Sequence, residues 1–152
     1  MKTYLITWKP EAGLFTEDEF NALKKTLRQN RFVDDDWRMR AAGVKKGERV
    51  VLFRQGKQTG LCGFGTILDD CVKQKKATRR YTVRLTNMRD SIDAPFLEKK
   101  ELTGAGIKKQ SLEMQSSSNG AISKEEVAVI ERLCQERLGH SLDELCTQYC
   151  VR

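Results

Sequence analysis

The sequence predicts an α+β fold built on a strongly curved, barrel-like mixed β-sheet with flanking helices. Residues 49–68, RVVLFRQGKQTGLCGFGTIL, are typical of a hairpin whose two β-rich runs are joined by a turn with Gly56 and Gly60 at positive φ. The second run alternates Gly60, Gly63 and Gly65 with bulky residues. Glycine weakens a strand unless curvature or a close neighbour requires it. Helical segments are interspersed among the strands without strict βαβ alternation, which favours α+β over a parallel α/β fold.

Four segments have the composition of strands, because β-branched and aromatic residues recur in them over short lengths. They are Thr3–Trp8, Val50–Phe53, Cys62–Leu68 and Tyr81–Leu85. The residues from Asn30 to Asp36 are polar and acidic and show no apolar period before Trp37, so no element is predicted there.

Three helices are predicted from capping boxes, in which a Ser or Thr N-cap and a Glu three residues later each accept a backbone N–H bond. The boxes stand at Thr16–Glu19, Ser123–Glu126 and Ser141–Glu144. The helices that follow are expected to end near Arg28, at Leu138 before Gly139, and near Cys150. In the last helix an apolar stripe of leucines, cysteines and Tyr149 indicates packing on the body of the protein, with a dimer contact as the alternative.

The other segments are predicted to connect these elements. Asp69–Ala77 reads as an exposed basic loop, which is either a solvated hairpin tip or a phosphate clamp. Pro95–Leu102 is expected to hold a short helical turn that Thr103–Gly106 ends, and Gln110–Gly120 reads as a polar loop rich in hydroxyl groups.

The length and the net charge of the chain limit the domain number, the location and the class of partner that we expect. We expect one domain over residues 1–152, with a core at about 3–138 and a C-terminal helical extension at 141–150. No apolar run approaches the ~20 residues of a membrane span, and no signal peptide is visible, so a cytoplasmic protein without a membrane partner is expected. The net charge is +7; residues 123–152 hold four basic and six acidic side chains, so residues 1–122 carry +9. Such a body suits a polyanion, with solubility as the simpler explanation.

No motif for chemistry is visible, so we expect no catalytic residue, no metal and no cofactor. His140 is the only histidine, and the five cysteines form no C-x-x-C pair. Phosphate-binding glycine motifs and the deaminase signature are absent. Cys134, Cys146 and Cys150 stand at helical spacing with leucines, where cysteine is usually a small core residue. A binding module therefore fits better than an enzyme.

Two tryptophans indicate what such a module could bind. Trp8 closes the first predicted strand, and Trp37 stands in a polar segment beside Arg38. Either could simply plug the core. Beside a basic, glycine-rich sheet, however, they could hold an unstacked nucleobase, because base–aromatic stacking contributes roughly 1–3 kcal/mol per base.

The order of these features resembles the EVE domain of the PUA-like superfamily. It consists of W-x-P at the first strand end, a Trp-bearing segment, GVKKGERVVLFRQGK, G-x-G-T-I, YTVRL and QSS before a C-terminal helix. The likeness covers about residues 3–138 and is greatest to EVE modules that precede HNH nuclease domains in modification-dependent restriction proteins. It implies a curved, barrel-like PUA-like sheet with a pocket for one flipped base, often a modified cytosine such as 5-methylcytosine in DNA.

The resemblance also implies which residues of this chain contact nucleic acid. The base pocket would be formed by Trp8, Trp37, Arg54, Gln55, Gly56, Gln115, Ser116 and Ser117. The nucleic-acid backbone would be met by Arg38 and Arg40, and from the basic character of their segments by Lys9, Lys73, Lys75, Lys76, Arg79 and Arg80.

Three departures bear on the ligand and on the activity. Lys9 replaces the Asn expected in W-N-P, Leu112 stands where Trp is expected, and the QSS segment is lengthened. No nuclease domain follows in the sequence, so cleavage would require a nuclease partner. The alternatives are an RNA-binding PUA-like module and a non-catalytic assembly protein that works through its last helix.

Overall fold

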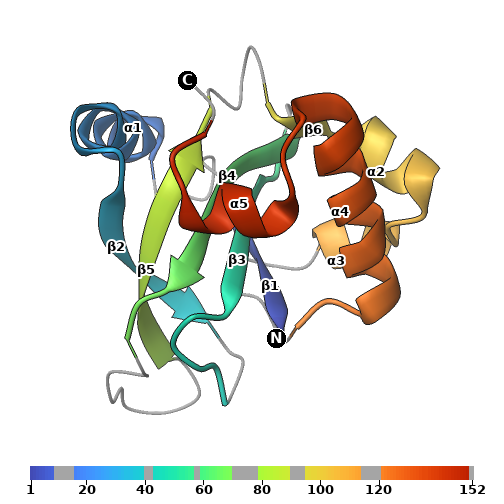
Figure 1. The fold of residues 1–152 in the computed structure, drawn as a ribbon, viewed down its shortest axis with the longest axis horizontal. Helices are drawn as coiled ribbons and strands as arrows, with labels where there is room; N and C mark the ends of the chain where they lie inside the picture. The colour runs from blue at the N-terminus through green and yellow to red at the C-terminus, as the bar shows by residue number, and fades with distance from the viewer. Residues whose placement is uncertain are drawn as a thin grey trace.

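The computed structural model of the chain describes residues 1–8, 16–39, 43–56, 59–69, 79–89, 95–113 and 121–150 (Figure 1). The elements in these residues follow the order β1 (Thr3–Trp8), α1 (Glu17–Asn30), β2 (Val33–Met39), β3 (Arg49–Arg54), β4 (Gly60–Ile67), β5 (Arg79–Met88), β6 (Leu97–Glu98), α2 (Lys99–Ala105), α3 (Lys109–Glu113), α4 (Lys124–Leu138) and α5 (Leu142–Thr147). The α+β class is confirmed. Every helix in the described part of the chain is too short or too polar to cross a bilayer.

The six strands form one mixed sheet. Five of them lie in the order β1-β3-β4-β5-β2, and β6 pairs with β4. β1 runs parallel to β3, whereas β3–β4, β4–β5 and β5–β2 are antiparallel. β1 and β2 are therefore the two edges, joined in the chain through α1. The strands of the described residues form an open sheet, so the closed barrel that the sequence suggested is not seen in them.

The sheet has a hydrophobic core on each face, because successive side chains of a strand point to opposite sides. On one face, β-strand side chains such as Ile6 and Leu52 pack with Phe20 and Leu27 of α1. On the other, Val51 and Phe53 belong to a cluster that includes residues of α2, α3, α4 and α5. Figure 1 shows α5 crossing β3, β4 and β5. The central strands β3 and β4 are consequently buried on both sides.

The glycines of β4 are explained by neighbours within the protein. A Cβ added at Gly65 would lie 2.1 Å from the Arg84 carbonyl oxygen of β5, and one added at Gly60 would lie 2.6 Å from Pro95 Cβ. The ladder is also irregular at Phe64/Gly65, which bends the strand. Gly56 has the expected positive φ, +108°, whereas the expectation of positive φ at Gly60 is wrong.

β2 is the strand that sequence patterning missed. Its sequence VDDDWRM contains three aspartates, a residue depleted in strands. Val33 and Trp37 are buried, whereas Asp34 and Asp36 are exposed. Across the ladder, Asp36 accepts a hydrogen bond from Thr82 Oγ1 at 3.0 Å. Asp34 and Asp36 are therefore compatible with a strand because their side of β2 faces solvent, whereas Asp35 is half-buried on the side of Val33 and Trp37.

The helix starts were predicted well and some ends were not. Side-chain caps are present at Thr16, Ser123 and Ser141. The predicted break at Thr103–Gly106 is wrong, because α2 continues to Ala105 and ends at Gly106 in the left-handed region. α3 forms in part of the segment expected to be a polar loop.

α5 ends earlier than predicted because a buried side chain competes for its carbonyl groups. Asn87 of β5 is fully buried, and its amide donates to the carbonyl oxygens of Leu145 and Gln148. Gln148 is extended, so the helix stops at Thr147 and the chain continues as an irregular strap along β5. This strap comprises residues 148–150.

Candidate functional site

Arg54, which the sequence assigned to a base pocket, is buried at the end of β3. Its residue surface is 5% exposed, and its guanidinium forms an ion pair with Glu17 in the first turn of α1. Removing a guanidinium from water is costly unless a carboxylate or other acceptors compensate it. Arg54 therefore ties the end of β3 to the start of α1.

Gln55 makes a second link from the same turn. Its side-chain amide donates to the Leu112 carbonyl oxygen of α3 at 2.9 Å. Gly56 follows, exposed and with a φ of +108° that a side chain would strain. The RQG turn is thus held by two elements far from it in the sequence, α1 and α3.

These links bring several predicted pocket segments to one place. The backbone of Trp8 is paired with Arg54 in the parallel β1–β3 ladder. Residues 9–15 lie outside the described residues, and α1 begins at Glu17. Gln115, Ser116 and Ser117 also lie outside the described residues, but they follow Leu112 by three to five positions. We call this convergence of the ends of β1 and β3 with α1 and α3 the β3-end site.

Trp37 is placed in the core. Its residue surface is 8% exposed, and it belongs to the hydrophobic cluster on the α1 face of the sheet. Its strand partner is Tyr81 of β5, which is also buried. The two tryptophans thus stand on opposite edge strands, Trp8 on β1 and Trp37 on β2.

The residues expected to meet a nucleic-acid backbone gather in part at the end of β2. Arg38 is directly opposite Arg80 in the β2–β5 ladder, and Met39 is opposite Arg79. We call Arg38, Arg79 and Arg80 the arginine end of this ladder. Lys9, Arg40, Lys73, Lys75 and Lys76 lie outside the described residues.

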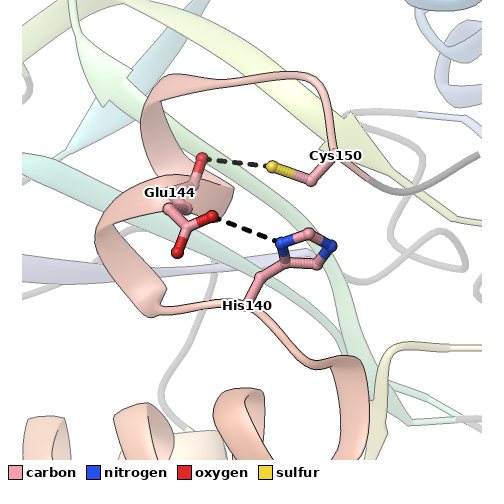
Figure 2. Close-up of side chains that lie close together, drawn as sticks. All are labelled: His140, Glu144 and Cys150. Carbon is pink, nitrogen blue, oxygen red and sulfur yellow. Dashed lines mark hydrogen bonds and ion pairs between the residues drawn. The ribbon is translucent and has the colours of Figure 1, made fainter.

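One group of possible metal ligands occurs elsewhere in the described residues and was not predicted. His140, Glu144 and Cys150 surround the start of α5 and the strap (Figure 2). His140 Nδ1 lies 3.4 Å from Glu144 Oε2, and the potential ligand atoms of the three residues all lie within 4.8 Å of one another. The sequence signal was partial, because only the His140–Glu144 spacing of four residues follows from a helical pattern.

The described thiols are not arranged for nucleophilic catalysis. Burial raises the pKa of Cys134 and of Cys146 to about 12, and it raises the pKa of Cys62 as well. Burial and the Glu144 carboxylate also raise the pKa of Cys150. A reactive cysteine needs the opposite shift, toward thiolate. Cys134 and Cys146 are fully buried core residues, as predicted, whereas Cys150 is partly exposed.

Comparison of the chain with protein-family models, curated proteins and solved structures finds no match.

Proposed function

We propose that this chain is a non-catalytic nucleic-acid-binding module that captures a modified base, 5-methylcytosine or a related cytosine in DNA, in a pocket at the β3-end site. The fold we propose for it is the PUA-like one implied by the EVE resemblance. The observation that carries the proposal is the meeting of Trp8, the RQG turn and α3 at one end of the sheet. The resemblance places pocket residues at Trp8 and in the RQG turn, and it assigns to the pocket the Gln115–Ser117 segment, which follows α3 in the sequence.

The roles in this proposal follow from burial and contacts. Arg54 and Gln55 fix the shape of the turn through Glu17 and Leu112. Trp8 supplies the stacking surface, and the Gln115–Ser117 segment supplies hydrogen bonds to the polar edge of the base. Trp37 is assigned to the core beneath this sheet face, because it is packed among apolar side chains.

The arginine end of the β2–β5 ladder supplies the phosphate contacts. Each arginine that neutralises a phosphate releases condensed counterions, so binding should weaken steeply as salt is raised. The concentration of positive charge in residues 1–122 supports this role.

The test is a binding titration with fluorescent oligonucleotides that differ at a single cytosine, modified or unmodified. A fitted apolar pocket discriminates one methyl group by roughly 10- to 200-fold, and we expect a preference in that range for the modified strand. Trp8→Ala should remove the preference but leave salt-dependent binding, because the phosphate contacts remain. Trp8→Phe, which keeps an aromatic face, is the matched control and should retain most of the preference.

Equal affinity of the unaltered protein for modified and unmodified strands would contradict base reading. RNA of the same length and sequence belongs in the same titration. Tighter binding to RNA than to DNA would favour an RNA-binding PUA-like module, which would use the same arginines on phosphates and 2′-hydroxyls.

A further inference from the structure

The segment from His140 to Cys150 brings together three side chains of kinds that can ligate a metal ion (Figure 2). His140 follows Gly139, which ends α4, and Glu144 lies in the first turn of α5. Cys150 lies in the strap beyond that helix. Three different parts of the chain therefore contribute one donor each.

Glu144 and Cys150 are held in position by contacts outside the cluster. Glu144 Oε1 accepts bonds from the backbone N–H and the hydroxyl of Ser141, at 3.4 and 3.3 Å, as part of the capping box. Its second oxygen, Oε2, faces His140. The backbone N–H of Cys150 donates to Asn87 Oδ1 at 2.9 Å, and Asn87 is fully buried. Supporting contacts of this kind orient metal ligands in known sites.

The donor set selects a class of ion. One imidazole nitrogen, one carboxylate oxygen and one thiol sulfur suit a borderline divalent ion such as Zn²⁺, whereas Mg²⁺ and Ca²⁺ prefer oxygen alone. With zinc–ligand bonds of about 2.0–2.3 Å, ligand atoms of a tetrahedral site lie about 3.3–3.8 Å apart. The observed atoms, within 4.8 Å of one another, need to approach by roughly 1 Å to reach that spacing.

We propose that His140, Glu144 and Cys150 bind one Zn²⁺-class divalent ion through three protein ligands. The fourth position faces solvent, because the His140 and Glu144 side chains are 33% and 48% exposed. On binding, the Cys150 thiol loses its proton to solvent and the sulfur bonds to the ion as thiolate. The ion then joins the end of α4 to the strap that lies on β5.

The experiment is a metal titration of untagged protein with a non-thiol reductant present. Zn²⁺ is competed against a chromophoric chelator, and Co²⁺ is added separately as a spectroscopic probe of thiolate ligation. Because His140 is the only histidine of the chain, its imidazole signals in a proton NMR spectrum report directly on ligation. We expect one ion per chain, a thiolate-to-cobalt absorption band, and a Zn²⁺-dependent shift of the His140 signals.

Three single variants test the ligands. His140→Ala, Glu144→Gln and Cys150→Ser should each weaken Zn²⁺ binding at least tenfold, since even the loss of a supporting contact costs about 10- to 100-fold. Glu144→Gln keeps an acceptor for the capping box, so the fold of α5 is preserved. Asp143→Asn, a neighbouring exposed carboxylate outside the cluster, is the matched control and should bind normally.

Two results of the Zn²⁺ titrations would overturn the proposal, and a competition with Mg²⁺ provides a further test. One is the absence of stoichiometric Zn²⁺ binding by the unaltered protein. The other is Zn²⁺ binding that is unchanged in all three variants, or that leaves the His140 signals unshifted, since the ion would then sit elsewhere. Excess Mg²⁺ should not displace Zn²⁺, and displacement would likewise contradict a site built on nitrogen and sulfur.

Discussion

The two ends of the β2–β5 ladder carry opposite electrostatic arrangements. At one end Arg84 forms two hydrogen bonds with the Asp34 carboxylate, at 2.8 and 3.0 Å, and its guanidinium lies 4.2 Å from the centre of the Phe32 ring. At the other end Arg38 stands opposite Arg80. The first end neutralises its arginine with an aspartate, whereas at the second end the register places two arginines opposite each other. Two arginines on one strand, Arg80 and Arg84, thus have different expected partners.

The comparison teaches that sequence charge alone does not identify a binding residue. Arg84 is a basic strand residue like Arg80, yet its charge is already matched by Asp34. Arg54 is a third case. It is buried and forms an ion pair with Glu17, so it connects β3 to α1. The arginines expected to contact phosphates are those that the register places opposite one another.

The largest effect on stability is expected from Trp37, the buried residue of β2 that lies between these two ends. Trp37→Ala should lower the free energy of unfolding by about 3–5 kcal/mol, because a large buried side chain is replaced by a cavity. Urea unfolding followed by circular dichroism measures this. A loss below about 1 kcal/mol would mean that Trp37 behaves as a surface aromatic, and it would restore Trp37 as a candidate stacking residue.

The next effect tests the arginine end itself. Arg38→Gln combined with Arg80→Gln should weaken nucleic-acid binding by at least about 100-fold, since each lost bond to a charged group costs about 1.5–3 kcal/mol. The slope of log affinity against log salt should fall by about 0.9 per lost contact on duplex DNA. Arg84→Gln, on the same strand, is the matched control.

An equal loss of nucleic-acid binding in Arg84→Gln would contradict the proposed difference between the two ends of the ladder. The free energy of unfolding of the double variant should be measured as well. It should change little, because like charges on opposite residues of a strand pair do not stabilise it.

The smallest effect on stability is expected from the ionisation of Asp35, which lies between Asp34 and Trp37 in β2. Burial raises its pKa. A hydrogen bond from the Asp36 backbone N–H and the charge of Arg80 oppose the rise, whereas the carboxylates of Asp36 and Glu19 add to it. Its folded-state pKa thus exceeds the ordinary 3.8, so the folded state holds the proton more tightly. Stability should fall as pH rises from 3.8 through the folded pKa.

Asp35→Asn removes this titration. The variant should be more stable than the unaltered protein at about pH 7, and its advantage should shrink toward about pH 3, where both chains carry a neutral side chain. Urea midpoints at the two pH values measure the difference. An advantage that grows on acidification would show that the Asp35 carboxylate is stabilised in the fold, with its pKa lowered by Arg80.

Local signals predicted much of the fold, and non-local pairing could not be predicted. Capping boxes located the starts of α1, α4 and α5, because the signal lies within four residues. The parallel pairing of β1 with β3 joins residues more than forty positions apart, and no local pattern specifies it. β2 was missed because the partners that accommodate its aspartates, Thr82 and Arg84, come from a distant strand.

The candidate sites divide in the same way. The sequence selected Arg54 and Gln55 but did not indicate Glu17 or Leu112 as their partners. The cluster at α5 was missed because the last helix was expected to continue to Cys150. In a continuous helix, residues six positions apart lie about 120° from each other around the axis, so Glu144 and Cys150 would not have faced one another. Asn87 binds the carbonyl groups at the end of α5, and its Oδ1 accepts a hydrogen bond from the backbone N–H of Cys150. These contacts place Cys150 near Glu144.

The position of α5 has a consequence for how the chain acquires its structure during synthesis. Leu142, Leu145 and Cys146 are fully buried in the cluster that covers β3, β4 and β5. A nascent polypeptide therefore exposes that apolar surface until residues 142–147 have emerged from the ribosome. The interior is therefore complete only once this segment is available, and until then the growing chain presents a surface to which chaperones bind.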